Sequence, residues 1–115
     1  MKATLKELWD SREILGKLAN QDFTAKVSYK LMKIIDQTNQ EIKPFAQARL
    51  NIFEKYGKRE GDTINIPEEN KETFRVEMTE LEDQEVEIKY SVTMDEIENA
   101  KLTPSELYMI DYMFR

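Results

Sequence analysis

Residues 24–57 of this 115-residue chain read TAKVSYKLMKIIDQTNQEIKPFAQARLNIFEKYG, and this stretch decides the fold. Thr24 is a residue type that caps helices, and Gly57 is one that ends them. Between them, positions at alternating steps of four and three residues form one line: Leu31, Ile35, Thr38, Ile42, Phe45, Arg49, Ile52 and Tyr56. This spacing predicts a single long helix with a heptad seam, on which Arg49 either fixes the register or extends its charge to water.

Pro44 lies inside this pattern and must bend or break a helix, because it lacks an N–H and clashes with the carbonyl of Gln40. The seam stays in phase on both sides of Pro44, which favours one kinked helix over two. Such a helix spans roughly 50 Å, whereas a compact domain of this length is about 30 Å across. We therefore expect the helix to protrude, to kink or to pair with another chain.

The flanking segments predict shorter elements. Apolar residues recur at roughly helical spacing over residues 5–19. Asp10 or Ser11 is suited to cap a helix there, and we favour a helix from about Ser11 to Ala19, which leaves the first nine residues as a short extended segment. The alternation of apolar and polar residues predicts strands at 63–66 and 85–92. Further helices are expected from Pro67 to about Asp83 and at 104–114, the latter after the capping box Thr103-Pro104-Ser105-Glu106. Residues 94–99 are expected to form a short acidic turn or helix.

These elements predict an α+β fold that is mostly helical. One long helix, kinked at Pro44, is accompanied by a small two-strand sheet and a C-terminal helix. The length suits a single domain covering residues 1–115. Residues 1–59 hold 12 Lys and Arg against 7 Asp and Glu, a balance of +5, and residues 60–115 hold 5 against 16, a balance of −11. This charge split favours head-to-tail or cross-subunit pairing between the basic half of one copy and the acidic half of another. It equally suits an acidic face that binds a basic partner.

Composition excludes most catalytic chemistry. The chain has no Cys and no His, so disulfides, thiolate or histidine catalysis and Cys- or His-ligated metals are excluded. The three glycines form no phosphate-binding loop. The acidic cluster at residues 77–87 follows the polar phases of a helix and a strand, which favours a solvated face over a metal or glycosidase site. We therefore predict no enzyme, no cofactor and no metal.

Two interaction surfaces follow from these patterns. Self-association, with a dimer favoured, is predicted through Leu31, Ile35, Ile42, Phe45, Arg49, Ile52 and Tyr56. Partner binding is predicted through the acidic and aromatic residues Glu77, Glu80, Glu82, Asp83, Tyr108, Tyr112 and Phe114. The C-terminal aromatic residues fit a core and an interface equally well. The net charge of −6 argues against nucleic acid as the partner, although several lysines lie on the long helix.

No apolar run approaches the 18 to 20 residues, roughly, that a membrane span needs. The N-terminal segment also lacks the apolar region of a signal peptide. We therefore expect a cytoplasmic protein without a membrane partner.

The layout of the chain resembles a family of small uncharacterised proteins encoded by phages and prophages of Gram-positive bacteria. The resemblance rests on the opening Leu-Lys-Glu-Leu, on residues 26–33, on the long helix ending Glu-Lys-Tyr-Gly, on the strand Glu-Val-Glu-Ile and on the ending Leu-Thr-Pro-Ser-Glu-Leu-Tyr-Met-Ile-Asp-Tyr. It covers nearly the whole chain. It implies a phage-encoded protein made in the bacterial cytoplasm, either a virion component or a host-directed factor.

Three functions fit these observations. The first is a non-enzymatic phage protein that self-associates and binds protein partners, for instance in particle assembly. The second is a phage inhibitor of a host enzyme or defence system that acts through the acidic half. The third is a small-molecule-binding domain that uses Glu residues and Tyr90.

Overall fold

One long helix forms the axis of the molecule. In the computed structural model, which describes residues 1–115, α2 runs from Ala25 to Tyr56 and passes through Pro44 without ending. The Thr24 hydroxyl caps it by accepting the Val27 N–H at 3.4 Å. Pro44 and Gln40 are both exposed, so the missing backbone hydrogen bond falls on the solvent side of the helix. The predicted single helix through Pro44 is confirmed.

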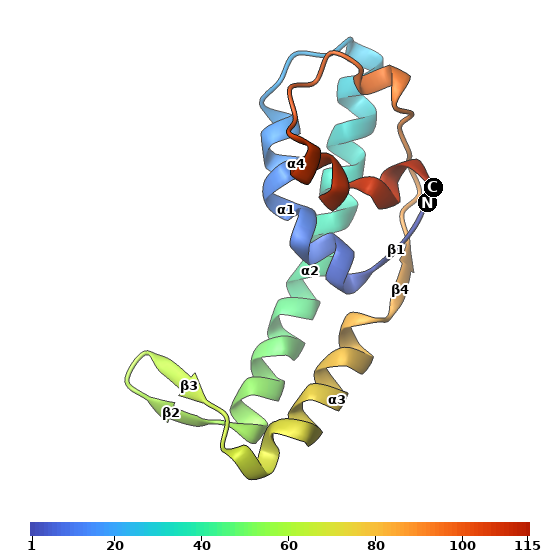
Figure 1. The fold of residues 1–115 in the computed structure, drawn as a ribbon. Helices are drawn as coiled ribbons and strands as arrows, with labels where there is room; N and C mark the ends of the chain where they lie inside the picture. The colour runs from blue at the N-terminus through green and yellow to red at the C-terminus, as the bar shows by residue number, and fades with distance from the viewer.

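The remaining elements are spread along this axis. The molecule measures 52 × 26 × 23 Å, and a helix of 32 residues is about 48 Å long, so α2 is nearly as long as the protein. Helix α1 (Leu5–Ala19) and the C-terminal segment (residues 88–115) cover its first half. Helix α3 (Lys71–Glu82) runs beside its second half (Figure 1). The sequence suggested a compact domain from which the helix would protrude. The molecule is instead elongated, and its other elements lie along the full length of the helix.

Helix α1 begins six residues earlier than predicted. Strand β1 (Lys2–Thr4) leads directly into it, and Thr4, not Asp10 or Ser11, is the N-cap. The Thr4 hydroxyl accepts the Glu7 N–H at 3.1 Å, and the Glu7 carboxylate accepts the Thr4 N–H at 3.0 Å. This reciprocal capping box fixes the start of the helix.

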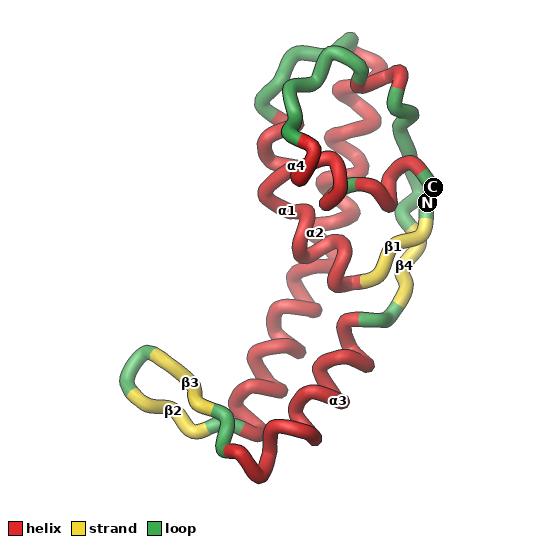
Figure 2. The backbone as a smooth tube through the Cα atoms, in the orientation of Figure 1, coloured by secondary structure: helices red, strands yellow, loops and turns green.

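Two separate two-stranded sheets replace the one predicted sheet (Figure 2). Strand β4 (Glu85–Glu87) pairs antiparallel with β1, with Thr4 opposite Glu85. The predicted strand at 85–92 is too long, because β1 offers only three residues to pair with. Strands β2 (Lys58–Glu60) and β3 (Thr63–Asn65) form a hairpin beside the end of α2. Its turn places Gly61 at a φ of 64°, a value that favours glycine.

The C-terminal part is more broken than predicted. A single 3-10 turn (Glu68–Asn70) precedes α3, and another (Asp95–Ile97) occupies the predicted acidic turn. Helix α4 covers only Pro104–Met109, with the predicted capping box at Thr103, and a 3-10 turn follows at Asp111–Phe114. The predicted helix 104–114 is interrupted at Ile110, which is fully buried, and this bend lets Tyr112 and Met113 also enter the core.

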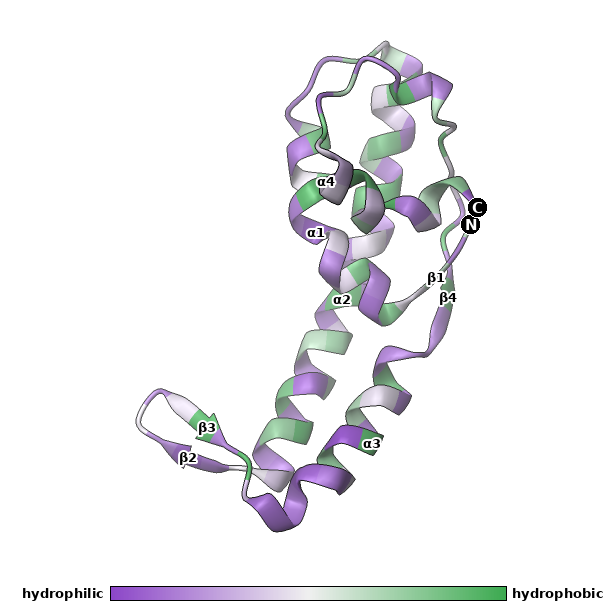
Figure 3. Cartoon of the chain, in the orientation of Figure 1, coloured by the Kyte–Doolittle hydropathy of each residue, from purple (hydrophilic) through white to green (hydrophobic).

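The main core lies between α1, the first half of α2 and the C-terminal segment. It includes Leu8, Leu15 and Leu18 of α1, Ile34 of α2 and Ile110, all at 2% exposure or less. Hydrophobic residues recur along the whole of α2 in Figure 3, which agrees with burial of the seam in both halves of the molecule. The overall α+β class, the long helix and the helical majority are confirmed. None of the helices has the length and hydropathy needed to cross a membrane.

Thr38 is a polar residue inside this core, and its hydroxyl has no hydrogen-bond partner. An unsatisfied buried hydroxyl costs about 1–3 kcal/mol. We expect Thr38→Val, which keeps the shape of the side chain, to raise the free energy of unfolding by about 1 kcal/mol, measured by urea denaturation. Thr38→Ser is the matched control, because it keeps the hydroxyl and removes a methyl group. A Thr38→Val protein less stable than wild type would mean that the hydroxyl is bonded in solution.

Candidate interaction surface

The predicted self-association residues are divided between the core and the surface. Leu31, Phe45 and Ile52 are buried by their own chain, at 8% exposure or less, and are unavailable to a partner. This part of the prediction is wrong because α1 and α3 occupy the seam from inside the same molecule. Ile35, Ile42, Arg49 and Tyr56 remain half-buried.

Tyr56 is used within the chain. Its hydroxyl donates to the Glu77 carboxylate, which also lies 3.3 Å from the Lys55 ammonium. The Tyr56 hydrogen bond and then Lys55 lower the pKa of the Glu77 carboxyl. Glu77, predicted as a partner-binding residue, therefore joins α3 to the end of α2.

The other predicted partner-binding residues are scattered. Tyr112 is buried, at 1% exposure, so that prediction is wrong: its ring fills the core, and its hydroxyl pairs with Ser11 at 2.7 Å. Phe114 is half-buried against the same core, and Glu82 pairs with Lys6 at 3.7 Å. The remaining three, Glu80, Asp83 and Tyr108, are exposed and have no ion-pair partner or side-chain hydrogen bond.

A different surface gathers the features of an interface. On α1, Trp9, Arg12, Gly16 and Ala19 recur at steps of three and four, and so share one side of the helix. On α2, Met32, Ile35, Asn39, Ile42, Ala46 and Arg49 do the same. None of these ten residues is fully buried. We call this set the α1–α2 face, because the two rows meet at both of their ends.

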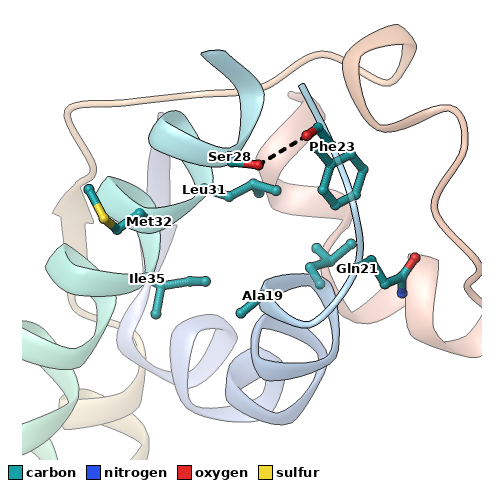
Figure 4. Close-up of a pocket in the computed structure, with 8 residues that line it drawn as sticks. Ala19, Gln21, Phe23, Ser28, Leu31, Met32 and Ile35 are labelled. Carbon is teal, nitrogen blue, oxygen red and sulfur yellow. Dashed lines mark hydrogen bonds between the residues drawn. The ribbon is translucent and has the colours of Figure 1, made fainter. Parts of the chain in front are cut away.

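One end of the α1–α2 face is an apolar pocket of about 270 Å³. Ala19, Phe23, Leu31 and Ile35 surround its opening, with Met32 at the edge, while Gln21 points away (Figure 4). The polar side chains of the lining are already satisfied: Ser28 bonds to the Phe23 carbonyl at 3.4 Å, and Gln21 bonds to the Lys101 backbone. The pocket therefore fits an apolar group.

The other end is built around Trp9. Its ring packs edge-on against Phe45 at 5.5 Å, the Arg12 guanidinium lies 3.9 Å from the ring centre, and that of Arg49 lies 5.3 Å from it. Neither arginine pairs with a carboxylate. The Arg49 Nε is buried and has no hydrogen-bond partner at all. Two cations and an aromatic ring are thus presented without an anion.

Between these two ends the face is open. A Cβ atom built on Gly16 would meet nothing within 4 Å, so no other part of the chain covers the middle of α1 on this side. Met32 is 55% exposed, which is high for a large apolar side chain. Apolar, aromatic and arginine side chains together are the composition of a protein-binding surface.

Some of the other charges are neutralised locally. Lys30 pairs with Glu96 and Lys17 pairs with Glu106, both at 2.8 Å, and these hydrogen bonds lower the pKa of each carboxyl. Both pairs tie the C-terminal segment to α2 or α1. They serve the fold. Among the five arginines, Arg59, Arg75 and Arg115 also pair with carboxylates, whereas Arg12 and Arg49 do not.

No protein-family model, curated protein or solved structure matches this chain. No group of three or more Asp or Glu side chains is placed to hold a metal ion.

The sequence contained a signal for the α1–α2 face that placing the helix start at Ser11 concealed. If the helix starts at Ser11, Trp9 lies outside it, and the spacing of Trp9 to Arg12, Gly16 and Ala19 does not indicate a shared side of a helix. With the start at Leu5, the four residues fall on one side. The pairing of Trp9 with α2 depends on tertiary packing and could not be read from spacing.

Proposed function

We propose that this protein is a non-enzymatic, phage-encoded protein that acts by binding other protein chains, including copies of itself, through the α1–α2 face. The observation that carries the proposal is the unpaired Arg12 and Arg49 beside Trp9, on a face that also holds an apolar pocket. Aromatic residues and arginines dominate binding energy at protein interfaces. Particle assembly is one process that would use such a protein.

A variant that fills the face tests this proposal. Gly16→Trp adds a bulky ring where the chain itself leaves space, so the fold is expected to survive. The tagged wild-type protein and the tagged Gly16→Trp variant are each used to capture partner proteins from host cells and from phage-infected cells. We expect the variant to capture at least tenfold less of every partner that the wild type binds specifically. Gly16→Ala is the matched control and should capture as wild type does. Equal capture by wild type and Gly16→Trp would contradict the proposal.

A second candidate function is inhibition of a host enzyme or defence system through the acidic half. The observation that favours it is the exposed, unpaired pair Glu80 and Asp83 on α3. In that case Glu80→Gln with Asp83→Asn would abolish capture of a host protein, and raised salt would weaken it, while Gly16→Trp would capture normally.

A further inference from the structure

The outer side of α3 carries a second row of unpartnered residues. Thr73, Val76 and Glu80 lie on α3, and Glu69 in the preceding 3-10 turn and Asp83 at the end of α3 continue the row at steps of four and three. All five are exposed. Val76 is the apolar residue of this row, and it is 43% exposed. Glu69, Glu80 and Asp83 have no ion-pair partner, whereas Glu72, Glu77 and Glu82 of the same segment each have one. We call this row the α3 stripe.

The α3 stripe and the α1–α2 face complement each other. The face presents two guanidiniums without carboxylates, and the stripe presents three carboxylates without cations. Both follow the heptad spacing by which helices pack side by side. The face runs about 26 Å along α2 from Met32 to Arg49, and the stripe runs about 21 Å from Glu69 to Asp83, so the stripe fits within the face.

We infer that the occupant of the α1–α2 face is the α3 stripe of a second copy of this chain. Arg12 and Arg49 of one copy face Glu80 and Asp83 of the other, and Val76 lies against the apolar residues of the face. Each copy carries both surfaces, and a two-fold axis between the copies makes the contact form twice in a closed dimer. The inference rests on the proposed function, because it names the partner of the same surface.

Reversal of charge on each side tests the pairing. The variant Arg12→Glu/Arg49→Glu makes the face acidic, and Glu80→Lys/Asp83→Lys makes the stripe basic. We expect each variant alone to be monomeric in sedimentation equilibrium, at protein concentrations up to about 100 µM, where wild type is dimeric. An equimolar mixture should recover the dimer mass, because both contacts between unlike variants are then attractive. Circular dichroism verifies that each variant is folded.

The absence of cysteine allows a second test that does not depend on Arg49, which is half-buried. Gly16→Cys and Val76→Cys place one thiol on each surface in an otherwise Cys-free chain. Under mild oxidation, a mixture of the two is expected to form a disulfide-linked heterodimer at least tenfold faster than a mixture of Gly16→Cys with Ser105→Cys. Ser105 is exposed on α4, outside both surfaces.

The outcomes separate this inference from the proposed function. A monomeric wild type, or a dimer that the charge reversals leave intact, overturns the inference. Equal cross-linking of Val76→Cys and Ser105→Cys also overturns it. The proposed function survives those results if Gly16→Trp still abolishes capture of a different chain, and it fails if that variant changes nothing.

Discussion

Replacement of Tyr112 by alanine is expected to lower the free energy of unfolding by about 3–5 kcal/mol. Tyr112 is the largest of the fully buried side chains and lies in the cluster that joins α1, α2 and the C-terminal segment. Its removal leaves a cavity, and the Ser11 hydroxyl loses its partner at 2.7 Å. Urea denaturation followed by circular dichroism measures the change. Since a domain of this size is stable by only about 5–15 kcal/mol, the variant is close to unfolding.

Two controls separate the contributions to this effect. Tyr112→Phe keeps the ring and removes the hydroxyl, and should cost about 1 kcal/mol, because Ser11 still donates to the Leu8 carbonyl at 3.1 Å. Tyr108→Ala changes a residue of the same segment that is 80% exposed, and should stay within about 0.5 kcal/mol of wild type. If Tyr112→Ala were as mild as Tyr108→Ala, the placement of the C-terminal segment would be wrong.

The same hydroxyl makes stability depend on alkaline pH. Burial raises the pKa of Tyr112 above its usual 10.0. In the unfolded chain the phenol ionises near pH 10, whereas in the folded protein it stays protonated to higher pH. Its contribution is therefore complete below pH 10 and is lost as the pH rises through the folded-state value. The stability difference between wild type and Tyr112→Phe should shrink above pH 10.

The sequence predicted the elements that depend on local pattern. The long helix through Pro44, the cap at Thr24 and the capping box at Thr103 all follow from spacing and residue type within a few positions. The predictions failed where a segment distant in the sequence determines the length or the end of an element. The length of β4 is set by β1, and the break at Ile110 is set by the core that Ile110 and Tyr112 enter.

The candidate surface was less predictable than the fold. A heptad seam such as that of α2 is read equally as a core or as an interface, and the choice depends on whether the same chain covers it. Here α1 and α3 bury Leu31, Phe45 and Ile52, and the open positions are those of the neighbouring row that includes Met32 and Ala46. Met32 and Ala46 each follow a buried residue by one position, a rotation of about 100° around the helix. The open row also shares Ile35, Ile42 and Arg49 with the predicted seam, so sequence spacing alone does not separate the two rows.

Gly57→Ala is the second substitution with a large expected effect. The sequence predicted Gly57 as the residue that ends the long helix, and it does so with a φ of −104°, a value that any residue adopts. Glycine is needed there for space. A Cβ would lie 2.3 Å from the Ile64 side chain and 2.7 Å from the Phe53 carbonyl oxygen. We expect Gly57→Ala to lower the free energy of unfolding by about 1–3 kcal/mol, because the β2–β3 hairpin must move away from α2.

Gly16→Ala is the matched control, and its effect has the opposite sign. Gly16 lies inside α1, where a Cβ meets nothing within 4 Å, so alanine adds no clash and reduces the freedom of the unfolded chain. It should raise the free energy of unfolding by about 0.5–1 kcal/mol, measured in the same urea titration. The two sites differ most in packing, because Ile64 and Phe53 lie against Gly57 and nothing lies against Gly16. If Gly57→Ala also stabilised the protein, the hairpin would not be held against the end of α2, and the conformation of residues 57–66 would have to be revised.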